Sequence, residues 1–130
     1  MLNKISTYRI CRFSVAFVWL YHGIVPKLLG PHADELTMNK SLGLSDESAM
    51  QLAMIAGVAE VIFGVIVLVF WHQRWPLVIT ILAMIGLLAF TVVFVPNLLA
   101  GAFNPVTTNL TVLALAVIAL KQPEVSKPWN

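Results

Sequence analysis

The segment PLVITILAMIGLLAFTVVFVPNLLA, residues 76–100, contains no charged side chain and indicates the class of protein. An α-helix needs about 20 mostly apolar residues to cross the roughly 30 Å hydrocarbon core of a bilayer. Apolar residues make up 59 % of the chain and charged residues 11 %, whereas soluble domains carry about 45–50 % and about 25 %. The sequence therefore predicts an integral membrane protein that contacts the lipid bilayer.

Three further segments, at about residues 9–29, 46–71 and 105–120, have the composition of membrane-spanning helices. The links that follow the second and third spans are short, which makes sequential helices antiparallel neighbours. We therefore expect one all-α domain over residues 1–130, an integral membrane four-helix antiparallel bundle. An outer loop at about residues 30–45 is expected to pack on it.

Helix signals support these limits. Ser45, followed by two acidic residues, is a good N-cap for the second span. Pro76 and Pro105 fit the first turns of the third and fourth spans. Asn104 is a natural N-cap for the fourth.

The basic residues predict the orientation. Cytoplasmic loops of membrane proteins carry an excess of Lys and Arg. With a cytoplasmic N-terminus, only Lys27 and Lys40 lie outside, and six basic residues lie inside: Lys4, Arg9, Arg12, Arg74, Lys121 and Lys127. We therefore expect a multi-pass protein of the bacterial inner membrane with both termini in the cytoplasm.

Several classes of function find no support in the sequence. The eight Lys and Arg residues form no basic run, so no nucleic-acid partner is expected. Cys11 is the only cysteine, which excludes an intramolecular disulfide and a Cys-based metal site within one chain. The three histidines are scattered across the predicted topology, so no metal site is expected.

Glu60 is the main candidate for a functional residue, because it lies near the middle of the second span. Intramembrane acids are costly and face the interior of a bundle, where they find partners. Gly57 and Gly64 share its helix face at the i−3 and i+4 positions, and small residues allow close approach of another helix. Glu60 is either a ligand or proton carrier, or a structural contact that fixes helix packing.

The first span supplies the expected partners of Glu60. Counting 1.5 Å per residue from the outer ends places Trp19 at about its depth and His22 about 5 Å above it. His22 either forms a buried hydrogen-bonded pair with Glu60 that shares a proton, or serves as a structural hydrogen-bonding residue. Lys27 lies nearer the outer surface, where it either lines a site or extends to the lipid headgroups. Arg12 is expected to be an interfacial anchor on the cytoplasmic side.

A second polar group lies at the outer ends of the third and fourth spans. It comprises Asn97, Asn104, Thr107, Thr108 and Asn109. Asn109 is the deepest of these residues and is expected to reach the interior. Together with His22 and Lys27, these side chains predict a cavity that suits an amphiphilic ligand with an oxygenated head, such as a quinone.

Three segments resemble the DoxX-like family. They are Arg12–Glu35 (RFSVAFVWLYHGIVPKLLGPHADE), Gly57–Gly64 (GVAEVIFG) and Asn104–Asn109 (NPVTTN). The resemblance implies a small bacterial inner-membrane protein of four helices. Relatives named DoxX or DoxD are linked to quinone-dependent thiosulfate oxidation and to membrane oxidoreductase complexes. The positions that it marks for testing are Trp19, His22, Lys27, Glu35, Glu60 and Asn109.

Three functions follow as hypotheses. The first is a membrane subunit that supports quinone-linked redox work through the polar cluster around Glu60, with Asn97, Glu35 and Arg12 as secondary candidates. The second is a non-enzymatic scaffold or assembly partner, acting as a homo-oligomer or with a membrane oxidoreductase. The third and least favoured is a proton-coupled transporter of a small solute.

Overall fold

The computed structural model describes residues 5–126, and all regular elements within this range are helical. The all-α prediction is thus confirmed for this part of the chain. In chain order the elements are α1 (Thr7–Gly23), the π-helical η2 (Ile24–Leu28), α2 (Ala33–Lys40), α3 (Asp46–Val69), α4 (Trp75–Phe94), the 3₁₀-helical η3 (Pro96–Ala100), α5 (Pro105–Leu120) and the 3₁₀-helical η4 (Pro123–Ser126).

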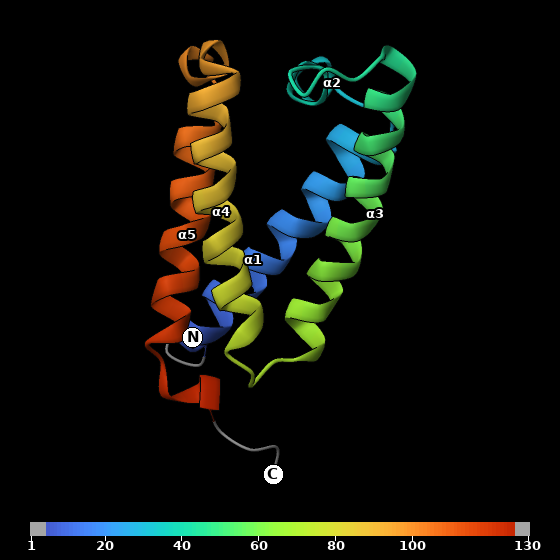
Figure 1. Ribbon diagram of the computed structural model, residues 1–130. Coiled ribbons are helices and arrows are strands. Elements are labelled where there is room, and N and C mark those ends of the chain that lie inside the picture. Colours follow the sequence, from blue (N-terminus) through green and yellow to red (C-terminus); the bar gives the residue numbers. More distant parts are fainter. Residues whose placement is uncertain (1–4, 127–130) are drawn as a thin grey trace.

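The long helices pack as two pairs, α1 with α3 and α4 with α5, and α1 also packs on α5 (Figure 1). The beginning of α1, the α3–α4 connection and the end of α5 lie at one end of the molecule. The helix α2 and the α4–α5 connection lie at the other end, where the two pairs diverge. We call these the terminal end and the α2 end.

Length and composition make α3 and α4 candidate membrane spans. Residues Thr7–Leu28 and α2 pass the same test as a bent pair, with an angle of 85° between them. The apolar helix α5 is shorter, at 16 residues. Within residues 5–126 there are therefore two candidate spans, or three if the bent pair is one span.

Side-chain caps fix the beginnings of α3 and α5. Ser45 Oγ accepts a hydrogen bond from the Ser48 amide, and Asn104 Oδ1 accepts one from the Thr107 amide. Both residues are extended N-caps that satisfy an amide left free in the first helical turn. The two N-caps predicted from the sequence are thus confirmed.

Glycines bring α1 and α3 into backbone contact. A β-carbon at position 23 would lie 2.6 Å from the Gly57 carbonyl oxygen, and one at position 64 would lie 2.8 Å from Leu20 Cγ. At position 23, where the contact is with backbone, any other residue type would require one of the two helices to move. The predicted small-residue face of the second span therefore does pack against the first span.

Two segments differ from the elements expected. The predicted helix over residues 76–100 ends at Phe94, because Val95 precedes Pro96 and leaves the helical region with φ −140° and ψ 55°. The predicted loop at residues 30–45 contains α2, which begins after Gly30 (φ 121°) and ends before Gly43 (φ 82°). Its first turn carries two acids and its last turn Lys40, in favourable order for the helix dipole.

Basic residues concentrate at the terminal end. The segments at this end carry Arg9, Arg12, Arg74 and Lys121, whereas Lys27 and Lys40 belong to η2 and α2 at the other. Lys4 and Lys127, which the sequence also predicts on the cytoplasmic side, lie outside the described residues.

Candidate functional site

A cavity of about 440 Å³ lies between the two helix pairs and is bordered by α2. Residues from α1, η2, α2, α3, α4 and α5 line it, together with the α4–α5 connection. Seven of the eight residues selected from the sequence line it: Trp19, His22, Lys27, Glu35, Glu60, Asn97 and Asn109. Its remaining wall is largely apolar and includes Val18, Ala56, Met84 and Leu87.

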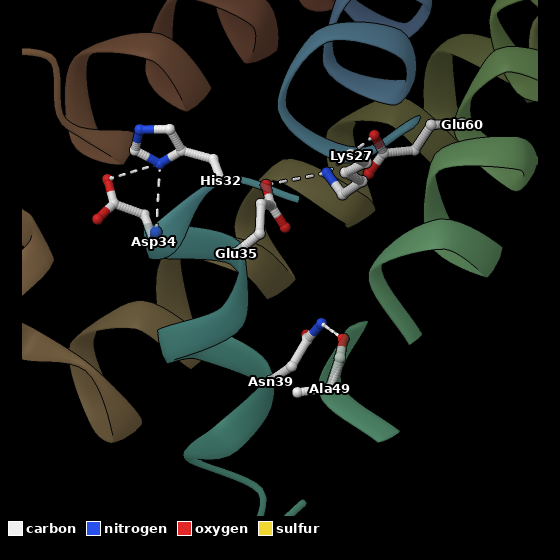
Figure 2. Close-up of polar contacts among 7 residues, drawn as sticks. All are labelled: Lys27, His32, Asp34, Glu35, Asn39, Ala49 and Glu60. Carbon is white, nitrogen blue, oxygen red and sulfur yellow. Dashed lines mark hydrogen bonds and ion pairs between the residues drawn. The ribbon is translucent and has the colours of Figure 1, made fainter. Parts of the chain in front are cut away.

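An ion cluster of one cation and two anions forms part of the cavity wall (Figure 2). Lys27 Nζ lies 3.0 Å from Glu60 Oε2 and 3.1 Å from Glu35 Oε1. The side chains of Lys27, Glu35 and Glu60 expose 8 %, 20 % and 19 % of their surface. Each carboxylate thus uses one oxygen on Lys27 and keeps the other for a further donor.

The π-helical turn η2 places Lys27 in this position. The Leu29 amide donates to the Ile24 carbonyl at 2.8 Å, the i→i+5 bond that defines the wide turn. On the neighbouring helix α3, a β-carbon at position 57 would lie 2.9 Å from Lys27 Cβ. Glycine at position 57 therefore leaves the space in which the lysine stem packs against α3.

The position of α2 brings Glu35 to the same ammonium group. The His32 amide donates to the Pro26 carbonyl at 2.7 Å, and Asn39 Nδ2 donates to the Ala49 carbonyl at 2.9 Å. Figure 2 shows the second of these bonds and the Glu35–Lys27 pair. The short helix is thus attached to η2 at one end and to α3 at the other.

The predicted His22–Glu60 pair is replaced by a Lys27–Glu60 pair. No hydrogen bond joins His22 to Glu60 in the described structure, although both line the cavity. The depth count assumed a regular α-helix beyond His22, and η2 departs from that geometry. Lys27 is buried with a carboxylate on either side and does not extend to the surface.

Trp19 links the helix pairs beside the cavity. Its Nε1 donates to Thr80 Oγ1 at 3.1 Å, and Thr80 in turn donates to the Pro76 carbonyl at 2.9 Å. Trp19 is therefore a tie between α1 and α4 as well as a wall residue, and its indole nitrogen is already occupied.

Asn109 faces the cavity with free polar atoms. It exposes 8 % of its surface, and its side chain makes no hydrogen bond within residues 5–126. Its amide atoms are not sealed off from the cavity, so a ligand or water there can satisfy them. Asn97 and Asn104 lie nearer the surface, and Asn104 serves as the N-cap of α5.

Sequence reasoning missed other residues of the cavity wall. Asp34, Met38 and Asn39 come from α2, and Met84 and Thr91 come from α4. Recognising Ala33–Lys40 as a helix would have placed the first three together. No charge or motif marks Met84 and Thr91 within an apolar span.

Arg12 lies outside the cavity and is fully buried among carbonyl groups near the terminal end. Its Nε, Nη2 and Nη1 donate to the carbonyls of Val67, Phe70 and Gln73 at 2.8, 2.5 and 3.1 Å. These carbonyls lie at and just after the C-terminus of α3, where the helix leaves its own acceptors unpaired and its dipole favours a cation. Arg12, which the sequence predicts to be an interfacial anchor, thus caps α3 from inside the protein.

No group of three or more His, Cys, Asp or Glu side chains suitable for a metal ion occurs within the described residues. The side chains that line the cavity can bind a ligand through hydrogen bonds and charge. The cavity combines a carboxylate-rich cluster, a free amide and a mainly apolar wall, which suits an amphiphile.

Comparison with known families gives a match that covers most of the chain. The family model of the DoxX-like family matches residues 16–117, a range that includes α3, α4 and the seven candidate residues in the cavity. Neither the curated proteins nor the solved structures yielded a match. The chain belongs to the DoxX-like family.

Proposed function

We propose that this DoxX-like protein binds an amphiphilic ligand with an oxygenated head in the cavity between its helix pairs. In this role it serves as a membrane subunit that supports quinone-linked redox work. The observation that carries the proposal is the cavity of about 440 Å³ with the Lys27–Glu35–Glu60 cluster in its wall. Ligand sites are typically about 300–1,000 Å³, mainly apolar, with a few convergent polar groups.

The proposal includes a topology of four crossings of the bacterial inner membrane, with both termini in the cytoplasm. The basic residues at the terminal end support this orientation under the positive-inside rule. The helix α5 is about 24 Å long at 1.5 Å per residue. This is shorter than the hydrocarbon core, and a short helix is accommodated by local thinning of the bilayer or by its flanking residues. Because α5 packs along α4, we include it as the fourth crossing.

The cavity then opens toward the outer side of the membrane. Its rim is formed by α2 and by residues of the α4–α5 connection, including Asn97 and Phe103. A ligand tail occupies the apolar wall, and the head lies against Lys27, Glu60 and Asn109. This arrangement matches the two parts of a quinone, an apolar chain and an oxygenated ring.

Quinone retention tests the proposal. We expect wild-type protein purified in mild detergent from quinone-producing cells to carry quinone, measured by extraction and chromatography. Glu60→Gln should retain several-fold less of the oxidised and reduced forms together, because it removes a charged acceptor for the hydroxyl groups of the reduced form. Glu47→Gln is the matched control, since Glu47 is an exposed acid in the first turn of the same helix and does not line the cavity.

Equal absence of quinone from the wild type and Glu60→Gln would overturn the quinone proposal. Equal retention by the wild type and by Glu60→Gln would show that binding does not depend on the Glu60 carboxylate. The ion cluster would then not be the binding site.

A second function, a non-enzymatic scaffold or assembly partner, is favoured by one observation. The bond from Lys27 to Glu60 joins η2 to α3 beside the Gly23–Gly57 backbone contact, so Glu60 also fixes helix packing. In this case Glu60→Gln should lower the unfolding temperature and change the oligomeric state or the co-purifying partner protein. Unchanged stability, oligomer size and partner recovery would reject it.

A further inference from the structure

The ion cluster has more hydrogen-bond acceptors than donors. An ionised carboxylate offers about four acceptor positions, and an ammonium group has three N–H donors. Lys27 donates one bond to Glu60 and forms an ion pair with Glu35, which leaves one N–H for both remaining carboxylate oxygens. The two acids and one base also carry a net charge of −1 when all three are ionised. The hydrogen-bonding positions that remain free in the cluster are therefore mostly acceptors, and they carry negative charge.

A second, independent feature of the same cavity is a polar side chain that is open to a ligand. Asn109 is more than nine-tenths buried, lines the same cavity and has no hydrogen-bond partner within residues 5–126. Its amide atoms are reached from the cavity, where a ligand or water can bond to them. Asn109 can both donate and accept, so it accommodates most headgroups and does not reverse the preference of the carboxylates.

Three other polar wall residues do not reverse this balance. The Trp19 indole N–H is already bonded to Thr80, so it is not available to a ligand carbonyl. His22 contributes one donor and one acceptor in its neutral form. Asp34, at the rim of the cavity, adds another carboxylate.

We propose that the cavity selects a headgroup that donates hydrogen bonds, through hydroxyl or ammonium groups, over one that only accepts them. This inference rests on the proposed function, which assigns an amphiphile to the cavity, and it specifies the chemistry of the head. Bonds from a donor to an ionised carboxylate are about twice as strong as neutral ones. A ligand with two carbonyl groups instead competes for one lysine N–H and leaves carboxylate oxygens without donors.

A matched pair of probes tests the preference. Decyl-benzoquinone and its two-electron reduced hydroquinone share the tail and ring but differ in two hydroxyl donors. We expect the wild-type protein in nanodiscs to bind the hydroquinone about ten-fold more tightly, measured anaerobically by equilibrium dialysis. Empty nanodiscs give the partition of each probe into lipid, which is subtracted.

Variants of the cluster locate the preference. Glu60→Gln should reduce the hydroquinone-to-quinone affinity ratio to near one, because its amide also donates. Glu35→Gln provides an independent test on a different helix should Glu60→Gln fold poorly, as judged by its unfolding temperature. Asn109→Leu should weaken the binding of both probes by a similar factor and leave the ratio of their affinities largely unchanged.

Two further probes distinguish the sources of the donor. Dodecylammonium and dodecanol share a tail, and both are expected to bind more tightly than methyl dodecanoate, which only accepts. Tighter binding of the ammonium assigns the donor to a cation, and tighter binding of the alcohol assigns it to a neutral hydroxyl.

The results separate the two proposals. Equal affinity for the matched pair, or tighter binding of the quinone, overturns the donor preference and leaves ligand binding in the cavity intact. If no probe binds above empty nanodiscs, ligand binding itself is wrong, and the donor preference falls with it.

Discussion

Two basic side chains are buried within residues 5–126, and their surroundings differ in kind. Arg12 exposes 0 % of its surface and donates three hydrogen bonds to main-chain carbonyls. Lys27 exposes 7 % and contacts two carboxylates in the wall of a cavity. Arg12 completes a helix terminus without an acidic partner, whereas Lys27 leaves two acids with accepting capacity. Burial of a charge alone therefore does not identify a site; the groups left unsatisfied around it do.

Replacing Arg12 should have the largest effect on stability. Arg12→Met leaves the Val67 and Gln73 carbonyls without a donor, at about 1–3 kcal/mol each, while the Phe70 carbonyl keeps its bond from the Gln73 amide. We expect a loss of about 4 kcal/mol in the free energy of unfolding, measured by reversible denaturation in mixed micelles. Arg12→Lys is the control for charge, and it should recover only part of the loss because one ammonium cannot reproduce the planar fork. A loss below about 1 kcal/mol would contradict the capping role.

Replacing Lys27 should have a smaller effect that a second substitution relieves. Lys27→Met leaves two partly buried carboxylates together, and removing one partner of a buried ion pair costs about 3–5 kcal/mol. We expect about 3 kcal/mol, at the low end of that range, because both acids retain some exposure. Adding Glu60→Gln should recover at least half. If the double variant is less stable than the single one, the acids do not repel each other in the variant.

The backbone contact beneath Lys27 predicts an intermediate effect. A β-carbon at position 57 meets the Gly23 carbonyl oxygen at 2.8 Å and Lys27 Cβ at 2.9 Å. Gly57→Ala should therefore cost about 2 kcal/mol through overpacking and weaken ligand binding by moving Lys27. Gly86→Ala in α4 is the matched control, because nothing lies within 4 Å of its new methyl group. This control should be neutral or stabilising by up to about 1 kcal/mol.

A third basic residue, which is exposed, should show the smallest effect of substitution on stability. Lys40 pairs with Asp46 at the surface, where their side chains expose 46 % and 86 %. Exposed ion pairs contribute about 0–1 kcal/mol. Lys40→Met should therefore change the free energy of unfolding by less than about 0.5 kcal/mol and leave ligand binding unchanged. A loss comparable to that of Lys27→Met would show that exposure does not separate these cations.

The sequence predicted the helical class and most helix limits, because uncharged runs, N-caps and prolines report directly on local structure. It also selected most of the polar cavity wall, since an intramembrane acid such as Glu60 needs polar neighbours. It could not predict the partner of Glu60, because the choice between His22 and Lys27 depends on the π-helical turn η2. Nor could it place Arg12, whose partners are backbone carbonyls and carry no side-chain signature.

The contact of one ammonium with two carboxylates has a consequence for how the family varies. Lys27, Glu35 and Glu60 come from η2, α2 and α3, three elements that meet at a single nitrogen atom. Replacing Lys27 leaves both carboxylates without their cationic partner, and replacing either acid changes the net charge around the other. The three positions should therefore substitute together among related chains, as co-varying residues in contact do. A relative that lacks the lysine is expected to have lost at least one of the acids.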